Sequence, residues 1–254
     1  MLKEVKIELT NRCARNCKHC SSSATNSSNN VKELGFEDVK KIIYEAKNMN
    51  IETIVFTGGE PLMYERLPEL VKLTSKLGLK STIYTFAYKT DETLNKYRQL
   101  IDFGLNKIVY SLAESLSDEE DASVYDKAEF FDKVFENNSA RLGFHYTVSK
   151  DSFSRLKQVV NETIDTFKTR SYFDKVSLLR FVPHGKGTID MDLSKEDGMW
   201  ISPKFKLLLI KEFERLIAIL FNFSNLSDCF SPSFIKTEFK FSKFAKHINS
   251  FIVA

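Results

Sequence analysis

Three of the four cysteines lie within eight residues of one another near the start of the sequence, where they could act together as metal ligands. Cys13, Cys17 and Cys20 form a C-x3-C-x2-C pattern in LTNRCARNCKHC, and Cys229 stands far away. Thiolates are soft ligands that select iron–sulfur clusters, zinc or Cu(I). Three thiolates on one loop can hold three corners of a cubane cluster and leave its fourth iron open to a ligand. The pattern therefore favours an iron–sulfur cluster.

Two other interpretations of the cysteines stay open. A structural zinc site needs four closed ligands. No fourth cysteine is near, and the ring of His19 would compete with its neighbours for the same metal. Alternatively, the three cysteines are incidental core residues. Arg12, Arg15 and Lys18 lie in the same loop, and nearby cations stabilise thiolates, which favours a ligand role.

A second chemically suggestive segment is the glycine pair in IETIVFTGGEPLM. Gly58 and Gly59 carry no Cβ, so a ligand can approach their backbone closely. Pro61 removes a hydrogen-bond donor and ends strand pairing. Backbone carbonyls and Glu60 offer acceptors to a cationic ammonium group. Taken alone, Gly-Gly is also a common structural turn.

The elements that must position these residues alternate between strands and amphipathic helices. The six expected strands are Val5–Leu9, Thr53–Phe56, Leu79–Thr85, Lys107–Leu112, Leu142–Val148 and Lys175–Val182. Helical spacing of apolar residues predicts helices over about 36–49, 67–77, 94–101, 127–136, 155–167 and 203–220, the second and third ended by Gly78 and Gly104. Such alternation predicts right-handed crossovers and a parallel sheet.

Six strand–helix units are fewer than the eight of a closed barrel, so the predicted fold class is α/β with an open, partial (β/α)6 parallel barrel. In such folds functional residues sit at the carboxyl ends of the strands. We expect a core domain over residues 1–200. Residues 201–254 would add a helix and a short irregular extension. This extension is either a terminal element that packs on the barrel or a truncated auxiliary domain.

Composition limits the classes of protein that remain. The 254 residues are 43% hydrophobic and 28% charged, with a formal net charge of +3. Disordered chains have lower hydrophobicity and a larger net charge, so a folded protein is expected. The near-zero charge gives no electrostatic case for nucleic acid as the main partner. No apolar run of about 18 residues predicts a membrane span, and MLKEVKIELT has no signal-peptide core. We therefore expect a cytoplasmic protein without a membrane partner.

The combination of the cysteine loop and the glycine turn resembles the radical S-adenosylmethionine (radical SAM) superfamily over roughly residues 3–190. The resemblance implies that Cys13, Cys17 and Cys20 bind a 4Fe-4S cluster whose open iron is chelated by S-adenosylmethionine. Gly58, Gly59 and Glu60 match the GGE motif that holds the methionine amino group. His19 takes the place of the aromatic residue that usually precedes the third cysteine, near the adenine.

Other strand ends are candidate cofactor contacts by the same resemblance. Thr85 ends the third strand in IYTFAY, where relatives often carry Thr-Asn-Gly, so the amide contact is missing or replaced. Ser111 ends the fourth strand and would meet the ribose, unless it is a buried serine. Arg180 ends the sixth strand and would bind the carboxylate of S-adenosylmethionine, unless it forms a structural ion pair. His145 and Thr147 share one face of the fifth strand, where a lone histidine is more typical of the core. No catalytic side chain is assigned.

The implied activity is reductive cleavage of S-adenosylmethionine to a 5′-deoxyadenosyl radical, which takes a hydrogen atom from a substrate. We expect a mostly apolar barrel interior around this radical. The basic residues of the cysteine loop would receive an acidic electron donor such as flavodoxin or ferredoxin.

The segment LLRFVPHGKG indicates the substrate class. It resembles the RFVPxGxG segment of radical SAM proteins with a C-terminal SPASM-type domain, many of which modify peptides. The cysteine-rich tail of such a domain is missing here. We favour a peptide substrate, with small-molecule or cofactor biosynthesis as the alternative. A non-catalytic metal-binding or iron–sulfur protein, or an inactive radical SAM remnant, also fits the sequence.

Overall fold

The computed structural model describes residues 2–15, 17–87, 90–112 and 124–192. They contain one six-stranded sheet in which every neighbouring pair is parallel and the spatial order follows the chain. The predicted α/β class and the open, partial barrel are confirmed. The strands are β1 (Glu4–Thr10), β2 (Thr53–Gly58), β3 (Lys80–Thr85), β4 (Lys107–Ser111), β5 (Arg141–Val148) and β6 (Phe173–Arg180).

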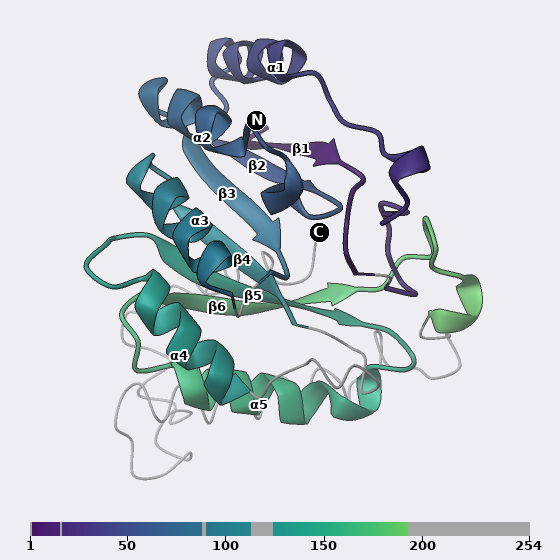
Figure 1. Ribbon diagram of the computed structural model, residues 1–254. Coiled ribbons are helices and arrows are strands. Elements are labelled where there is room, and N and C mark those ends of the chain that lie inside the picture. The colour runs from purple at the N-terminus through teal and green to yellow at the C-terminus, as the bar shows by residue number, and fades with distance from the viewer. Residues whose placement is uncertain (1, 16, 88–89, 113–123, 193–254) are drawn as a thin grey trace, which may run out of the picture. The chain divides into compact units, whose positions relative to one another are not determined.

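A helix follows each of the first five strands and covers the same face of the sheet (Figure 1). Positive φ values of 69° at Gly78 and 100° at Gly104 end the second and third helices as predicted, because glycine adopts this conformation without a steric cost. The sixth expected helix and the extension fall outside the described residues. The helices are α1 (Phe36–Asn48), α2 (Leu67–Lys76), α3 (Asp91–Asp102), α4 (Val124–Val134) and α5 (Leu156–Phe167).

The hydrophobic core lies between the helices and the face of the sheet that they cover. Strand residues such as Ile54, Phe56 and Phe144 are at most 1% exposed there. The rings of Phe131 and Phe167 from α4 and α5 contact Phe144 from β5, with ring centroids 6.3 and 4.7 Å apart. Edge-to-face and tilted aromatic contacts of this kind stabilise a core beyond the area that they bury. This packing fixes the curvature of the sheet on which the site is built.

The opposite, inner face of the sheet is polar, so the expectation of a mostly apolar interior is wrong for the described strands. On β1 the apolar residues Ile7 and Leu9 point to the helices. The charged Lys6 and Glu8 therefore point to the inner face, where Glu8 is in register with Thr57 of β2 and Lys6 with the buried Val55. The alternation in EVKIEL carries this information, because side chains of a strand alternate between its faces.

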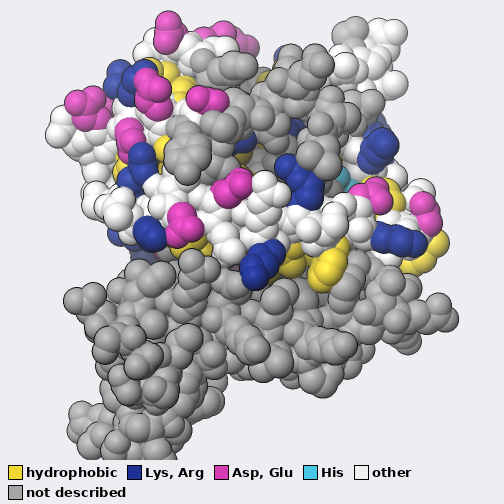
Figure 2. All heavy atoms as spheres, turned by 90° about the horizontal axis from the view of Figure 1, so that it is seen from below, with side chains coloured by type: hydrophobic (Ala, Val, Ile, Leu, Met, Phe, Trp, Pro, Cys, Tyr) yellow, Lys and Arg dark blue, Asp and Glu magenta, His cyan; other side chains and the backbone are white. Residues whose placement is uncertain are grey.

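Within the described residues, β1 and β6 each pair with one strand, so the sheet is open between them. No helix of the described part is long and apolar enough to cross a membrane. On the face seen in Figure 2, basic and acidic side chains are interspersed between small, separate apolar patches. This face therefore presents no extended field of one charge.

Candidate functional site

The cysteine loop begins where β1 meets the end of β2. A register shift after Glu8 brings Thr10 opposite Gly58. The N–H of Gly59 donates to the carbonyl of Thr10 at 2.6 Å, and the N–H of Glu60 donates to the carbonyl of Arg12 at 2.8 Å. A Cβ on Gly59 would collide with the Arg12 carbonyl and come within 2.7 Å of its carbon. Only glycine at this position allows β2 to end directly against the loop.

The loop is also bonded to its own returning segment. The N–H of Cys13 donates to the carbonyl of Thr25 at 2.9 Å, and the N–H of Thr25 donates to the carbonyl of Asn11 at 2.9 Å. The Sγ of Cys20 accepts a hydrogen bond from the N–H of Ala24 at 3.3 Å. These bonds fold the loop back on itself at the carboxyl end of β1, which is where parallel α/β folds place function.

The three cysteines of the loop form no disulfide within the described residues; Cys13 is buried, and Cys17 and Cys20 are half-buried. Burial raises the pKa of Cys13 to about 11, so its thiolate persists only when a cation compensates the charge. Among the described residues, no three Cys, His, Asp or Glu side chains converge on one metal ion. In a cubane cluster each cysteine binds a different iron, so its ligands lie farther apart than those of a single ion. The charges of Cys17 and Cys20 contribute to the raised pKa of Cys13, so the three side chains lie near one another on the loop, as ligands of one cluster would.

The cations of the loop have different surroundings. Arg12 forms an ion pair with Glu33 at 3.2 Å. The guanidinium of Arg15 lies over the ring of Phe86, 5.0 Å from its centroid, which joins the cysteine loop to the segment after β3. Lys18 is exposed, and His19 is half-buried in the same loop.

Glu60 joins the ends of β2 and β3. Its carboxylate is 3% exposed and accepts hydrogen bonds from the hydroxyl of Thr85 at 2.9 and 3.0 Å. The backbone N–H groups of Leu62 and Phe86 donate to the same carboxylate at 3.0 and 3.1 Å. Burial nevertheless raises the pKa of Glu60 to about 7. Two predicted cofactor contacts, Glu60 and Thr85, are thus brought together and bonded to each other.

The remaining predicted contacts lie at other strand ends. Ser111 ends β4 in register with His145 of β5, and Arg180 ends β6 in register with Val148. His145 and Thr147 share the inner face as expected, since both are half-buried between fully buried neighbours. The sheet therefore carries Ser111 and His145 on one side, whereas Thr85 belongs to the buried network on the helix side.

Two inner-face residues, Tyr84 and Lys6, were missed by the sequence reasoning. The ring of Tyr84 contacts the ring of His145 edge-on at 4.8 Å, and the ammonium of Lys6 lies 5.4 Å from the Tyr84 centroid. Burial first, and then the nearby charges of Lys6, Lys107 and Lys175, together lower the pKa of His145 to about 4. The imidazole is therefore neutral at pH 7. Strand alternation could have placed these residues on one face. It could not have predicted that side chains from different strands contact each other there.

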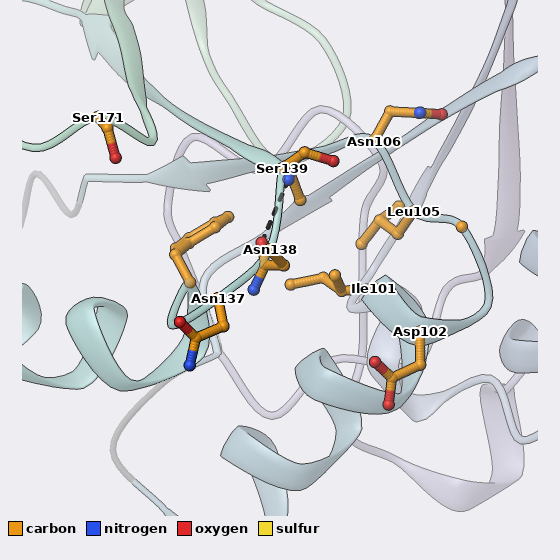
Figure 3. A pocket seen from close by; sticks show the side chains of 11 residues that line it. Ile101, Asp102, Leu105, Asn106, Asn137, Asn138, Ser139 and Ser171 are labelled. Atoms are coloured by element: carbon orange, nitrogen blue, oxygen red, sulfur yellow. Dashed lines mark hydrogen bonds between the residues drawn. The ribbon is translucent and has the colours of Figure 1, made fainter.

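One hollow in the described part, of about 700 Å³, is not at this site. It is lined by Asn137, Asn138 and Ser139 before β5 and by Leu105 and Asn106 before β4 (Figure 3). These positions are the amino ends of the strands, opposite the cysteine loop. A second hollow, of about 490 Å³, lies beside Cys17 and Lys18 and is bounded by Lys186, Thr188 and Met191. The second hollow is the one that adjoins the candidate site.

The radical SAM superfamily model matches residues 7–138, just over half of the chain. The protein belongs to this superfamily. The parallel sheet, the cysteine loop and the glycine turn described above agree with this membership. Membership implies S-adenosylmethionine and an iron–sulfur cluster as cofactors.

The similar proteins have different activities. GTP 3′,8-cyclase from Clostridium botulinum is 25% identical over 190 residues, 72% of this chain and 57% of that protein. PqqA peptide cyclase from Bradyrhizobium diazoefficiens is 32% identical over 117 residues, 45% of this chain and 30% of that protein. The crystal structure of Streptococcus suis SuiB bound to precursor peptide SuiA matches with a TM-score of 0.61 and 16% identity, covering 84% of this chain and 46% of that one. The chain spans 20% and 57% of the length of the first two curated relatives that it matches.

Proposed function

We propose that this protein is a radical SAM enzyme that holds a 4Fe-4S cluster on Cys13, Cys17 and Cys20 and acts on a peptide. The observation that carries this proposal is the placement of the three cysteines on a loop that Gly58 and Gly59 pin at the carboxyl edge of the sheet. When bound, the cluster supplies one electron to the sulfonium of S-adenosylmethionine, which yields methionine and a 5′-deoxyadenosyl radical that abstracts hydrogen from the substrate.

The chain's own residues bind and orient S-adenosylmethionine in this proposal. Gly58 and Gly59 bring the end of β2 against the cysteine loop, where the amino group of S-adenosylmethionine binds in this proposal, and Glu60 accepts a hydrogen bond from it. A bound ammonium would also stabilise the carboxylate of Glu60, whose pKa burial raises to about 7. Thr85 orients Glu60 through the two hydrogen bonds described above.

The remaining contacts to S-adenosylmethionine are assigned to residues of the cysteine loop and of two further strand ends. Ser111 binds the ribose, His19 lies near the adenine, and Arg180 binds the carboxylate of the methionine part. Ser111 is half-buried at the end of β4, on the polar inner face. That face offers a substrate hydrogen-bonding and charged groups below the cofactor, so recognition there is polar rather than purely hydrophobic.

A peptide substrate is supported by two relatives, PqqA peptide cyclase and SuiB, whose structure holds a precursor peptide. A small-molecule substrate is the second candidate, because GTP 3′,8-cyclase matches over more of this chain than PqqA peptide cyclase does. Adding pools of short peptides or of nucleoside triphosphates to the reduced enzyme separates the two. The pool that raises 5′-deoxyadenosine above the substrate-free level identifies the substrate class.

The electron donor is expected to be an acidic protein such as flavodoxin or ferredoxin, in a cytoplasmic setting. Lys18 is exposed on the cysteine loop, whereas Arg12 is paired with Glu33. Charge complementarity at such a loop steers the encounter of two proteins. Raising the salt concentration should therefore slow donor-dependent turnover more than turnover with a chemical reductant.

The activity is tested by anaerobic reconstitution with iron and sulfide, followed by reduction in the presence of S-adenosylmethionine. We expect about four irons per chain and formation of 5′-deoxyadenosine. The Cys17→Ala variant should lose both, whereas Cys229→Ala, which changes a cysteine outside the motif, should keep both. A reconstituted protein that never cleaves S-adenosylmethionine would favour the non-catalytic iron–sulfur alternative, and a Cys17→Ala protein that still cleaves it would overturn the ligand assignment.

A further inference from the structure

The turn after β6 contacts the cysteine loop, although the two segments follow opposite edges of the open sheet. The N–H of Lys186 donates to the carbonyl of Cys20 at 2.9 Å. Gly185 has a φ of 65°, and a Cβ on it would collide with the Cys20 carbonyl and lie 2.5 Å from the Ser21 carbonyl oxygen. Figure 1 shows the green segment after β6 beside the purple loop after β1.

The shape of this turn is set within residues 181–187. The N–H of Gly187 donates to the carbonyl of His184 at 3.1 Å, which closes the turn. A Cβ on Gly187 would lie 2.6 Å from the ring of Phe181, which is 2% exposed. Phe181 in turn donates its N–H to the carbonyl of Val148 at 3.2 Å. The turn is therefore anchored in the sheet before it reaches Cys20.

We propose that the turn 184–187 is a main-chain clamp that bridges the open side of the sheet and positions Cys20, and thereby sets how firmly the cysteine loop retains an iron–sulfur cluster. This inference rests on the proposed function only in taking the group that the loop retains to be an iron–sulfur cluster. Gly185 is a positioning residue: it touches the main chain of Cys20 and Ser21 and leaves the thiol free for its ligand.

The decisive variant is Gly185→Ala, which adds one methyl group against two carbonyl oxygens. Gly78→Ala is a matched control, because Gly78 has a similar φ of 69°. The nearest atom to a Cβ at Gly78 is the Lys47 Nζ at 3.9 Å, far from the cysteine loop in the fold. Both variants carry the cost of a left-handed backbone for alanine, but only Gly185→Ala pushes on the loop. Gly185→Asn is a third variant, since asparagine tolerates this backbone but carries a Cβ.

Two measurements follow, one on the reconstituted protein and one on the protein without iron. Iron loss to a chelator, followed by absorbance, should be about 5- to 30-fold faster in Gly185→Ala and Gly185→Asn than in the parent, the factor that one or two lost main-chain hydrogen bonds carry. Amide hydrogen exchange of residues 17–24 should also be faster in both variants without iron. Gly78→Ala should match the parent in both measurements.

Unchanged iron retention and unchanged exchange of residues 17–24 in Gly185→Ala would overturn the clamp. Equal effects in Gly78→Ala would overturn it as well, because they would trace to general destabilisation. If the parent protein binds no cluster, the proposed function fails. The clamp is then judged by hydrogen exchange alone, which needs no iron.

Discussion

The two ends of the cysteine loop are held by different kinds of structure. At its start, Gly58 and Gly59 belong to β2, which pairs directly with β1, so the anchor is part of the sheet. At its end, Cys20 is held by a turn that follows β6, five residues beyond the last strand. The first anchor forms between neighbours in the sheet, and the second joins its two unpaired edges.

These two anchors show that the start of the loop is fixed by local sheet pairing. The end of the loop depends instead on the curvature of the whole sheet. Glycine is used at both ends because each contact is made between main chains. The start of the loop also relies on a buried carboxylate, Glu60. The hydrogen bond from the turn to the end of the loop is a main-chain bond, so the two ends should respond differently to substitution and to pH.

The largest effect is expected for Gly59→Ala. Its Cβ would meet the main chain of Arg12 and Asn11, at 2.7 and 2.9 Å from their carbonyl carbons, and neither can move without breaking the end of the β1–β2 pair. We expect a loss of about 3 kcal/mol in the free energy of unfolding and no cluster after reconstitution. Urea unfolding and iron analysis check this. A variant with parental stability and iron content would show that sheet pairing does not fix the start of the loop.

A pH-dependent effect is expected for Glu60→Gln, small near pH 5 and largest near pH 8. The pKa of Glu60 is raised from 4.5 to about 7, so the folded state keeps a proton that the unfolded state releases. Stability therefore falls as the pH rises through this window, by about 3 kcal/mol for this group. Glutamine mimics the protonated form and removes this decline.

Urea unfolding between pH 5 and 8, without iron or S-adenosylmethionine, measures the difference between the parent and Glu60→Gln. The two should be similar near pH 5 and diverge toward pH 8, with the variant the more stable. The Gly185→Ala protein should instead follow the pH dependence of the parent. Parallel curves for the parent and Glu60→Gln would contradict the raised pKa.

The smallest effect is expected for Gly143→Ala on β5. Its Cβ would come within 3.1 Å of the Cε of Lys107, the far end of a flexible side chain that can shift. We expect a change in unfolding free energy below about 1 kcal/mol and parental cluster retention, because the loop is not touched. Iron loss as fast as in Gly185→Ala would show that any glycine of the sheet affects the cluster, which would remove the contrast between the two ends.

Local patterns in the sequence account for the elements and for the motif residues. The apolar alternation of strands and the 3.6-residue spacing of helices are properties of neighbouring residues, so all six strands and five of the helices could be predicted. Cys13, Cys17 and Cys20 could be assigned to a strand end for the same reason. The alternation of charged and apolar residues in EVKIEL could also have predicted the polar inner face, which the overall composition does not reveal.

The parallel α/β fold and the cysteine loop after β1 could be inferred from the order of residues, because both arise from short-range spacing. The bond between Glu60 and Thr85, the contact of Tyr84 with His145 and the contact of Gly185 with Cys20 are visible only in the folded chain. Each of these contacts joins residues that are far apart in the chain. Their meeting depends on how the packed helices curve the sheet, a property that no segment of the sequence carries alone.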